Sequence, residues 1–412
     1  AVGISIVASM LSSLSYLSEP GEVWKSGVTH VAGKLVGIPF EMVVVWGFCI
    51  PFMMRFRYTS AYEYLGDRFG VATRRLGVLL FLCMVVLWMG FVVLASAKAV
   101  HAVTGIPVPL FIIVLGTVAT IYTMLGGLRA VVWTDVVQVA LLTGGGLATI
   151  AFVAWQTGTW IPDWLATASD YVSSQQNMTK IPWFSWDPTL RATVVTVAVN
   201  MFVWHLCMHT SNQITVQRYF STDSPRSARR GFLASSVIHV GIDLLLVTVG
   251  LAVLYYYVGQ GIEIDGGLSP ETDRDLIFPV FAMQRLPVGC GGAILAALLA
   301  AAMSTIDSGV NSIATVITVE LHEGENQQAK QPVNHVGIAM VVTLMAGAFI
   351  TIAAFGISFL PARWGIVGAI PRTFNLVTGP LGGLFLIGIF MAPIGQRAAI
   401  VATICGLVTS VV

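Results

Sequence analysis

Charged residues are scarce in this chain of 412 residues. Asp, Glu, Lys and Arg together make up only 10% of it, whereas apolar residues make up 56%. A soluble domain usually carries about 25% charged residues. The net charge is +1, and no basic tail or strip of basic and aromatic residues indicates nucleic acid binding. The composition therefore excludes an ordinary soluble domain and predicts a protein that crosses the lipid bilayer many times.

Cysteine is also rare, and catalytic motifs are missing. Neither metal-type spacing nor a disulfide framework links the five cysteines, which we interpret as reduced packing residues: Cys49, Cys83, Cys207, Cys290 and Cys405. His205 and His209 form an HxxxH pair, but the HExxH signature of zinc proteases is absent. Because no convincing nucleophile and base or metal set is present, we expect no enzyme.

Apolar runs close to the length of about 20 residues that a membrane helix needs fill most of the chain. Eleven spans are predicted, at roughly 1–24, 36–54, 76–104, 108–126, 131–156, 190–215, 231–258, 288–318, 335–357, 364–392 and 397–412. No soluble domain interrupts them, so a single transmembrane domain over 1–412 is expected. The chain opens at Ala1 and closes at Val412 inside an apolar run, so both termini look truncated.

Basic residues are shared unequally between the two sides of the membrane. If the first span runs from the cytoplasm outward, the cytoplasmic connections hold Arg55, Arg57, Arg68, Arg74, Arg75, Arg129, Arg218, Arg226, Arg229, Arg230, Lys330 and Arg397. The outer connections then hold only Lys25, Lys34, Lys180, Arg191, Arg274, Arg285 and Arg363. This bias predicts a multi-pass plasma membrane protein with cytoplasmic arginine-rich loops and external loops at 157–189 and 259–287.

The first and sixth spans each have a polar, poorly helical middle. In the first, Ser9, Ser12, Ser13, Ser15 and Ser18 precede Glu19-Pro20-Gly21. In the sixth, His205, His209, Thr210, Ser211, Asn212 and Gln213 lie close together. Interrupted helices five spans apart indicate an inverted repeat with a binding site between them.

The eighth span carries polar groups along one helical face. Ala301, Ser304, Thr305 and Ser308 are spaced to share that face, and Asp307 stands at its edge. Oxygen ligands of this kind suit a hard cation such as sodium. An ionisable residue within a span costs about 3 kcal/mol on insertion scales, which points to function. The alternative is that small residues allow close helix packing and the hydroxyls bond their own backbone.

Four motifs give the chain a resemblance to a known family. They are Thr123–Gln138 (TMLGGLRAVVWTDVVQ), Arg57–Leu65 followed by Arg68-Phe69, Asn212-Gln213 followed by Val216-Gln217-Arg218, and the 300–312 stretch. In these the chain resembles the sodium/solute symporters, which include sodium-coupled sugar, sialic acid, monocarboxylate, vitamin and iodide carriers. The resemblance implies an all-α leucine-transporter-type fold. Its first and sixth core helices would be broken, its two five-helix inverted repeats would cover about 1–156 and 188–392, and a partial further helix would cover 397–412.

The resemblance also implies sodium ligands. The main site would use the backbone of Ala8 and Leu11, at the break of the first helix, with Ala301, Ser304 and Thr305 of the eighth. A second sodium, found in some members, would use Asp135, Ser304, Asp307 and Ser308. Asp307 stands where those members carry a serine. The alternative for Asp307 is a structural carboxylate satisfied by helix-terminal amides or by an arginine such as Arg129.

The solute site departs from the sugar carriers. Glu41 falls where they place a hydroxyl-binding glutamate, but nearly every other sugar contact is changed. The substrate-binding residues predicted here are Ser15, Glu41, His205, Met208, His239 and Arg372. His239 and Asp243 are four residues apart, and simple pairing between them is the favoured reading. Arg372 either anchors a carboxylate or, as we favour, is an interfacial charge beside Arg363.

Together these features predict a secondary active symporter. Inward sodium flow would drive import of a small polar organic solute, such as a sugar or a carboxylate, by alternating access. The alternative is a sensor or channel that keeps the same fold without coupling ion to solute.

Overall fold

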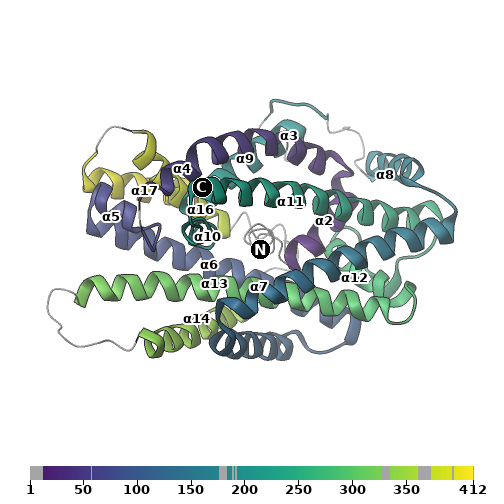
Figure 1. The fold of residues 1–412 in the computed structure, drawn as a ribbon. Helices are drawn as coiled ribbons and strands as arrows, with labels where there is room; N and C mark the ends of the chain where they lie inside the picture. Colours follow the sequence, from purple (N-terminus) through teal and green to yellow (C-terminus); the bar gives the residue numbers. More distant parts are fainter. Residues whose placement is uncertain are drawn as a thin grey trace.

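The computed structural model describes residues 13–56, 58–175, 183–187, 190, 193–325, 335–360, 373–391 and 394–411. Within these ranges it places all side chains except those of 126–136, 321–325, 335–336 and 411. Over the described residues the regular structure is entirely helical (Figure 1). The α-helices are α2 (Ser13–Ser26), α3 (Thr29–Val44), α4 (Ile50–Met53), α5 (Glu63–Phe69), α6 (Val71–Thr104), α7 (Val108–Thr157), α8 (Ile161–Gln175), α9 (Val194–Ser211), α10 (Gln213–Phe220), α11 (Pro225–Leu254), α12 (Arg274–Arg285), α13 (Cys290–Glu325), α14 (His335–Ile357), α16 (Phe374–Phe390) and α17 (Gln396–Val411).

Among the described residues, eight helical stretches are long and apolar enough to cross a bilayer. Two shorter apolar helices, Phe374–Phe390 and Gln396–Ser410, follow them in the chain. Together with α2, these elements correspond to the eleven expected spans. The protein is therefore a multi-pass membrane protein.

The element α7 holds two of those spans. A straight helix of 50 residues would be about 75 Å long, far more than a bilayer requires. Both ends of α7 lie at the right of Figure 1, so the element turns back between its apolar stretches Val108–Leu125 and Val137–Thr157. The expectation of separate spans in this region therefore agrees with the fold.

Two expectations about the start of the chain are wrong. The second span begins at Thr29 rather than near residue 36, so Lys34 lies buried within α3 and not in an outer loop. The physical reason is that carboxylates on other helices compensate its charge. In addition, Glu19-Pro20-Gly21 is not a poorly helical stretch, because α2 continues through it.

Close helix packing brings α2 into the middle of the molecule. It contacts α11, α12, α6 and α13. A β-carbon on Gly21 would lie 2.8 Å from an Asp275 oxygen of α12, and one on Gly250 of α11 would lie 2.8 Å from the Pro20 carbonyl. Glycine at both positions lets the backbones approach, as small residues do in membrane bundles. The consequence is that polar groups of α2 face neighbouring helices rather than lipid.

Candidate functional site

The sixth span is broken at Asn212. This residue has extended backbone (φ −89°, ψ 114°) between α9 and α10, and its side chain accepts a hydrogen bond from the Ile214 amide at 2.9 Å. The Tyr62 hydroxyl donates to the Ser211 carbonyl at 2.7 Å, and Gln213 bonds the backbone of Thr59 and Ala61. Asn212 and Tyr62 thus satisfy an amide and a carbonyl that the break leaves without helical partners, and Gln213 ties the break to the segment before α5.

The proposed sodium residues of α13 lie together on a buried face. Ala301, Ser304 and Thr305 are each no more than 1% exposed. The Thr305 hydroxyl donates to the Ala301 carbonyl at 2.8 Å, which leaves its oxygen lone pairs able to accept or to coordinate. Ala8 and Leu11 lie outside the described residues. The described part of the site therefore offers neutral oxygen ligands in a buried environment, which suits a hard cation such as sodium.

One turn further along α13, Asp307 and Ser308 contact two other helices. The Thr123 hydroxyl of α7 donates to Asp307, which is fully buried. Arg218 of α10 donates to the Ser308 hydroxyl at 3.1 Å. The side chain of Asp135, the other residue expected here, lies outside the described part of the chain. Of the predicted second-sodium residues, the structure thus places Ser304, Asp307 and Ser308 on one helix and adds Thr123 and Arg218 beside them.

Glu41, His205 and His209 form a second buried group between α3 and α9. His205 makes an ion-pair contact with Glu41, and the His209 Nε2 atom lies 3.5 Å from the other Glu41 oxygen. The Nδ1 atom of His209 lies 2.5 Å from the Tyr219 hydroxyl. All three residues are buried, with Glu41 6%, His205 5% and His209 1% exposed. The HxxxH pair thus holds a carboxylate, and among the described residues no cluster of His, Cys, Asp or Glu is arranged to hold a metal ion.

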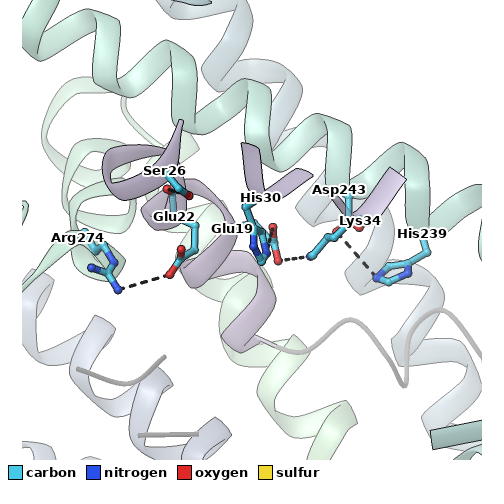
Figure 2. A network of polar contacts seen from close by, with 8 residues as sticks. All are labelled: Glu19, Glu22, Ser26, His30, Lys34, His239, Asp243 and Arg274. Carbon is cyan, nitrogen blue, oxygen red and sulfur yellow. Dashed lines mark hydrogen bonds and ion pairs between the residues drawn. The ribbon is translucent and has the colours of Figure 1, made fainter. Parts of the chain in front are cut away.

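A third buried group joins α2, α3 and α11 (Figure 2). The Lys34 ammonium lies 2.5 Å from a Glu19 oxygen and 3.6 Å from an Asp243 oxygen. We call Glu19, Lys34 and Asp243 the lysine–carboxylate cluster. His30 and His239 flank it, each with a ring nitrogen 3.9 Å from a carboxylate oxygen, on Glu19 and Asp243 respectively. The expected pairing of His239 with Asp243 is therefore present, but Lys34 lies closer to Asp243.

The second and third groups adjoin one another. The rings of His205 and His239 lie 6.1 Å apart, so polar side chains run from α2 through α3 and α11 to α9. Three of the predicted substrate residues, Glu41, His205 and His239, are brought together in this way. Ser15 in α2 and Met208 in α9 are only partly buried, and Arg372 lies outside the described residues.

Sequence reasoning missed the roles of Glu19 and Lys34. The sequence pattern predicts a helix interruption at Glu19 and an outer loop at Lys34. The available signal was that two ionisable residues of opposite sign lie near the ends of adjacent apolar runs. Such residues are expensive in a membrane unless they pair.

A further charged group lies where α2 meets α12. Arg274 contacts Glu22 at 3.4 Å, and Asp275 is buried beside them, with its Oδ1 atom lacking a hydrogen-bond partner among the described residues. Burial in this position raises the pKa of the Asp275 carboxyl from 3.8 to about 6.

The raised pKa predicts a stability that falls as pH rises. Between pH 3.8 and about 6 the folded protein holds a proton on Asp275 that the unfolded chain has released, so ionisation in the fold costs up to about 3 kcal/mol. Asp275→Asn should therefore raise the melting temperature in detergent at pH 7.5 and flatten its decline between pH 4 and 6. Asp170→Asn, on the exposed face of α8, is the control. An unchanged pH dependence in Asp275→Asn would contradict the assignment.

Comparison with known proteins places this arrangement in a family. The family model for the sodium:solute symporter family matches residues 1–406. The chain is 28% identical over 413 residues to the sodium/sialic acid symporter SiaT of Proteus mirabilis, covering 100% of this chain and 80% of that protein. It is 30% identical to the sodium-dependent multivitamin transporter of Oryctolagus cuniculus, covering 99% of this chain and 62% of the relative.

Solved structures agree on the fold. A sodium-coupled sialic acid symporter, in a substrate-bound outward-open state, superposes with a TM-score of 0.81 at 25% identity, over 100% of this chain and 87% of that one. The nucleobase-cation-symport-1 transporter Mhp1 gives a TM-score of 0.61 at 14% identity, over 100% and 90% of the two chains. The fold is thus of the leucine-transporter type. The relatives named for sialic acid and vitamins are sodium-coupled transporters rather than enzymes. By its sequence and fold, the chain belongs to the sodium:solute symporter family.

Proposed function

We propose that this protein imports a small polar organic solute by alternating access, driven by the inward flow of sodium. The buried hydroxyl face of α13 carries the proposal, because Ser304 and Thr305 offer a sodium ion neutral oxygens without opposing charge. The sodium-coupled relatives support symport. Because the chain covers only part of each relative's length, their solutes are not transferred to it.

The driving force suffices for accumulation with a single ion. Each sodium charge gains about 2.3 kcal/mol per 100 mV of membrane potential, which supports a roughly fiftyfold solute gradient before the sodium gradient is added. The main ion site in this proposal comprises Ala8, Leu11, Ala301, Ser304 and Thr305. Asp135, Ser304, Asp307 and Ser308 are proposed for a second sodium.

The deciding experiment measures coupling directly. Purified protein in liposomes should take up radioactive sodium faster when a transported solute is supplied outside, and solute uptake should require sodium. Binding of solute without any solute-dependent sodium flux would favour the alternative of a sensor. Sodium flux that is independent of solute would favour a channel.

The solute side of the proposal centres on Glu41 and His205. Glu41 and His205 contact each other, so a solute that binds them exchanges this contact for its own hydrogen bonds, and removing one of the two residues leaves a buried group unsatisfied at a cost of about 1–3 kcal/mol. Glu41→Gln or His205→Ala is expected to raise the apparent solute constant by about tenfold. Solute-free sodium binding should change little. A loss of sodium affinity as large as that in Ser304→Ala would remove the altered residue from the solute site.

Orientation is proposed from the arginine-rich connections and is tested by labelling. Ser227 and Ser173 are both exposed, at the start of α11 and the end of α8 respectively. In a cysteine-free background, a membrane-impermeant thiol reagent added to intact cells should label Ser173→Cys and leave Ser227→Cys unlabelled until the cells are opened. The reverse pattern would invert the proposed topology.

A further inference from the structure

We propose that the transported solute carries a protonated nitrogen with N–H groups, and that this nitrogen binds between Glu19 and Asp243 of the lysine–carboxylate cluster. The inference rests on the proposed function and names its solute class. Three independent features support it: the charge of the buried residues, the hydrogen-bonding capacity that they leave over, and the charge of the adjoining loop.

The buried polar residues carry more negative than positive charge. Among the described residues that line α2, α3, α9 and α11 here, Glu19, Glu41 and Asp243 supply three carboxylates, and Lys34 supplies one ammonium. Glu41 contacts both His205 and His209, so the excess negative charge lies at Glu19 and Asp243, where two carboxylates share the single ammonium of Lys34. A buried charge without compensation is strongly unfavourable, so a cation is expected to complete the group when the solute site is filled.

Two oxygens of the lysine–carboxylate cluster also lack hydrogen-bond partners among the described residues. Lys34 contacts one oxygen of Glu19 and one of Asp243. The Glu19 Oε2 and Asp243 Oδ2 atoms are buried and have no hydrogen-bond partner within the described part of the chain. Glu19 is 7% exposed and Asp243 is 2% exposed. Both atoms are acceptors only, so the group that satisfies them must donate.

Geometry places the two carboxylates on either side of one lysine. Figure 2 shows Lys34 reaching from α3 between Glu19 of α2 and the α11 helix that carries Asp243 and His239. The flanking histidines lie too far away for hydrogen bonding, at 3.9 Å. A protonated amine with N–H donors against Glu19 Oε2 and Asp243 Oδ2 would satisfy these two atoms and offset the second carboxylate charge, which Lys34 alone leaves over, whereas a carboxylate would bring no donor to them.

The adjoining loop also favours a cation. Residues 259–287 hold five carboxylates against two arginines, and α12 within this loop packs against α2. In the proposed orientation this loop lies on the side from which solute enters. A negatively charged entrance raises the local concentration of cations and increases their rate of association.

The inferred solutes are therefore a narrower class than the small polar organic solutes of the proposed function. A primary or secondary amine, or a zwitterion with such an amine, satisfies both oxygens and the charge. A quaternary ammonium supplies charge without N–H donors, and a simple carboxylate or a neutral sugar supplies no positive charge. The relatives named for sialic acid carry an acid, so this chain would differ from them in the sign of the group that it recognises.

A thermal-shift screen of the purified full chain tests the inference. The probes are butylamine, 4-aminobutanoate, proline, betaine, butanoate and glucose, each with sodium and with potassium. Butylamine, 4-aminobutanoate or proline should raise the melting temperature, since ligands of the folded state stabilise it by mass action. Betaine, butanoate and glucose should not. Stabilisation by butanoate, glucose or betaine instead, or by none of the amines, overturns the inference.

Variants locate the site and separate the two proposals. Asp243→Asn and Glu19→Gln should each weaken binding of the stabilising amine at least tenfold, whereas the exposed Asp170→Asn should not. Unchanged amine affinity in both folded variants places the amine elsewhere and overturns the inference.

Other outcomes of the screen separate this inference from the proposed function. If an acid or a sugar stabilises the protein only in sodium, the amine inference is wrong while the proposed sodium symport is still supported. If amines stabilise the protein equally in sodium and in potassium, the amine site is supported and the proposed coupling of solute binding to sodium is contradicted.

Discussion

Ser304→Ala and Thr305→Ala are each expected to abolish sodium-driven solute accumulation while leaving the protein folded. Both hydroxyls lie on the buried face of α13, and each substitution removes one proposed oxygen ligand of sodium, together with a methyl group in Thr305→Ala. The measurements are sodium affinity, from the sodium dependence of the melting temperature, and uptake into liposomes. Sodium affinity should fall at least tenfold in each variant.

A matched control separates ion binding from ordinary packing. Thr403 of α17 is also buried, and its hydroxyl donates to the Ala399 carbonyl at 2.8 Å, just as Thr305 donates to Ala301. Thr403→Ala removes the same kind of hydrogen bond at a distant position and should leave sodium affinity unchanged. If the Thr305 variant keeps accumulating solute, its hydroxyl only bonds its own backbone, and the proposed sodium site loses that ligand.

Lys34→Met is expected to cause the largest loss of stability, about 3–5 kcal/mol, because it leaves Glu19 and Asp243 as uncompensated buried charges. The measurement is the melting temperature in detergent at pH 7.5, together with the yield of monodisperse protein. The difference in stability between Lys34→Met and the wild type should shrink as the pH falls, because protonation of either carboxylate removes part of the repulsion between them.

A double variant shows whether charge or packing is responsible. Glu19→Gln in the Lys34→Met background removes one of the two carboxylates that have lost their ammonium partner. It should therefore recover part of the lost stability. If the loss came only from the changed side-chain shape, the second substitution would add its own cost and recover nothing. That result would mean that the lysine–carboxylate cluster does not hold α2, α3 and α11 together electrostatically.

The sequence alone was sufficient to predict the number of spans, although not the start of the second, and the polar face of α13. Both depend on local periodicity, because apolar runs of fixed length cross the bilayer and residues spaced at three and four positions share a helical face. The interruption of the sixth span was also predictable, since the polar residues that end α9 are adjacent in the chain. Asn212 and Gln213 lie at the observed break.

Only the tertiary structure decided which ionisable groups pair. Asp307 meets Thr123 across 184 positions of the chain, and Lys34 meets Asp243 on a helix that the sequence does not place beside α3. The sequence pattern predicts an outer position for Lys34 because the predicted second span begins only near residue 36. Packing of α2, α3 and α11 supplies the carboxylates that make its burial favourable. Periodicity reports which face of a helix is buried, whereas the crossing of helices determines which charges meet there.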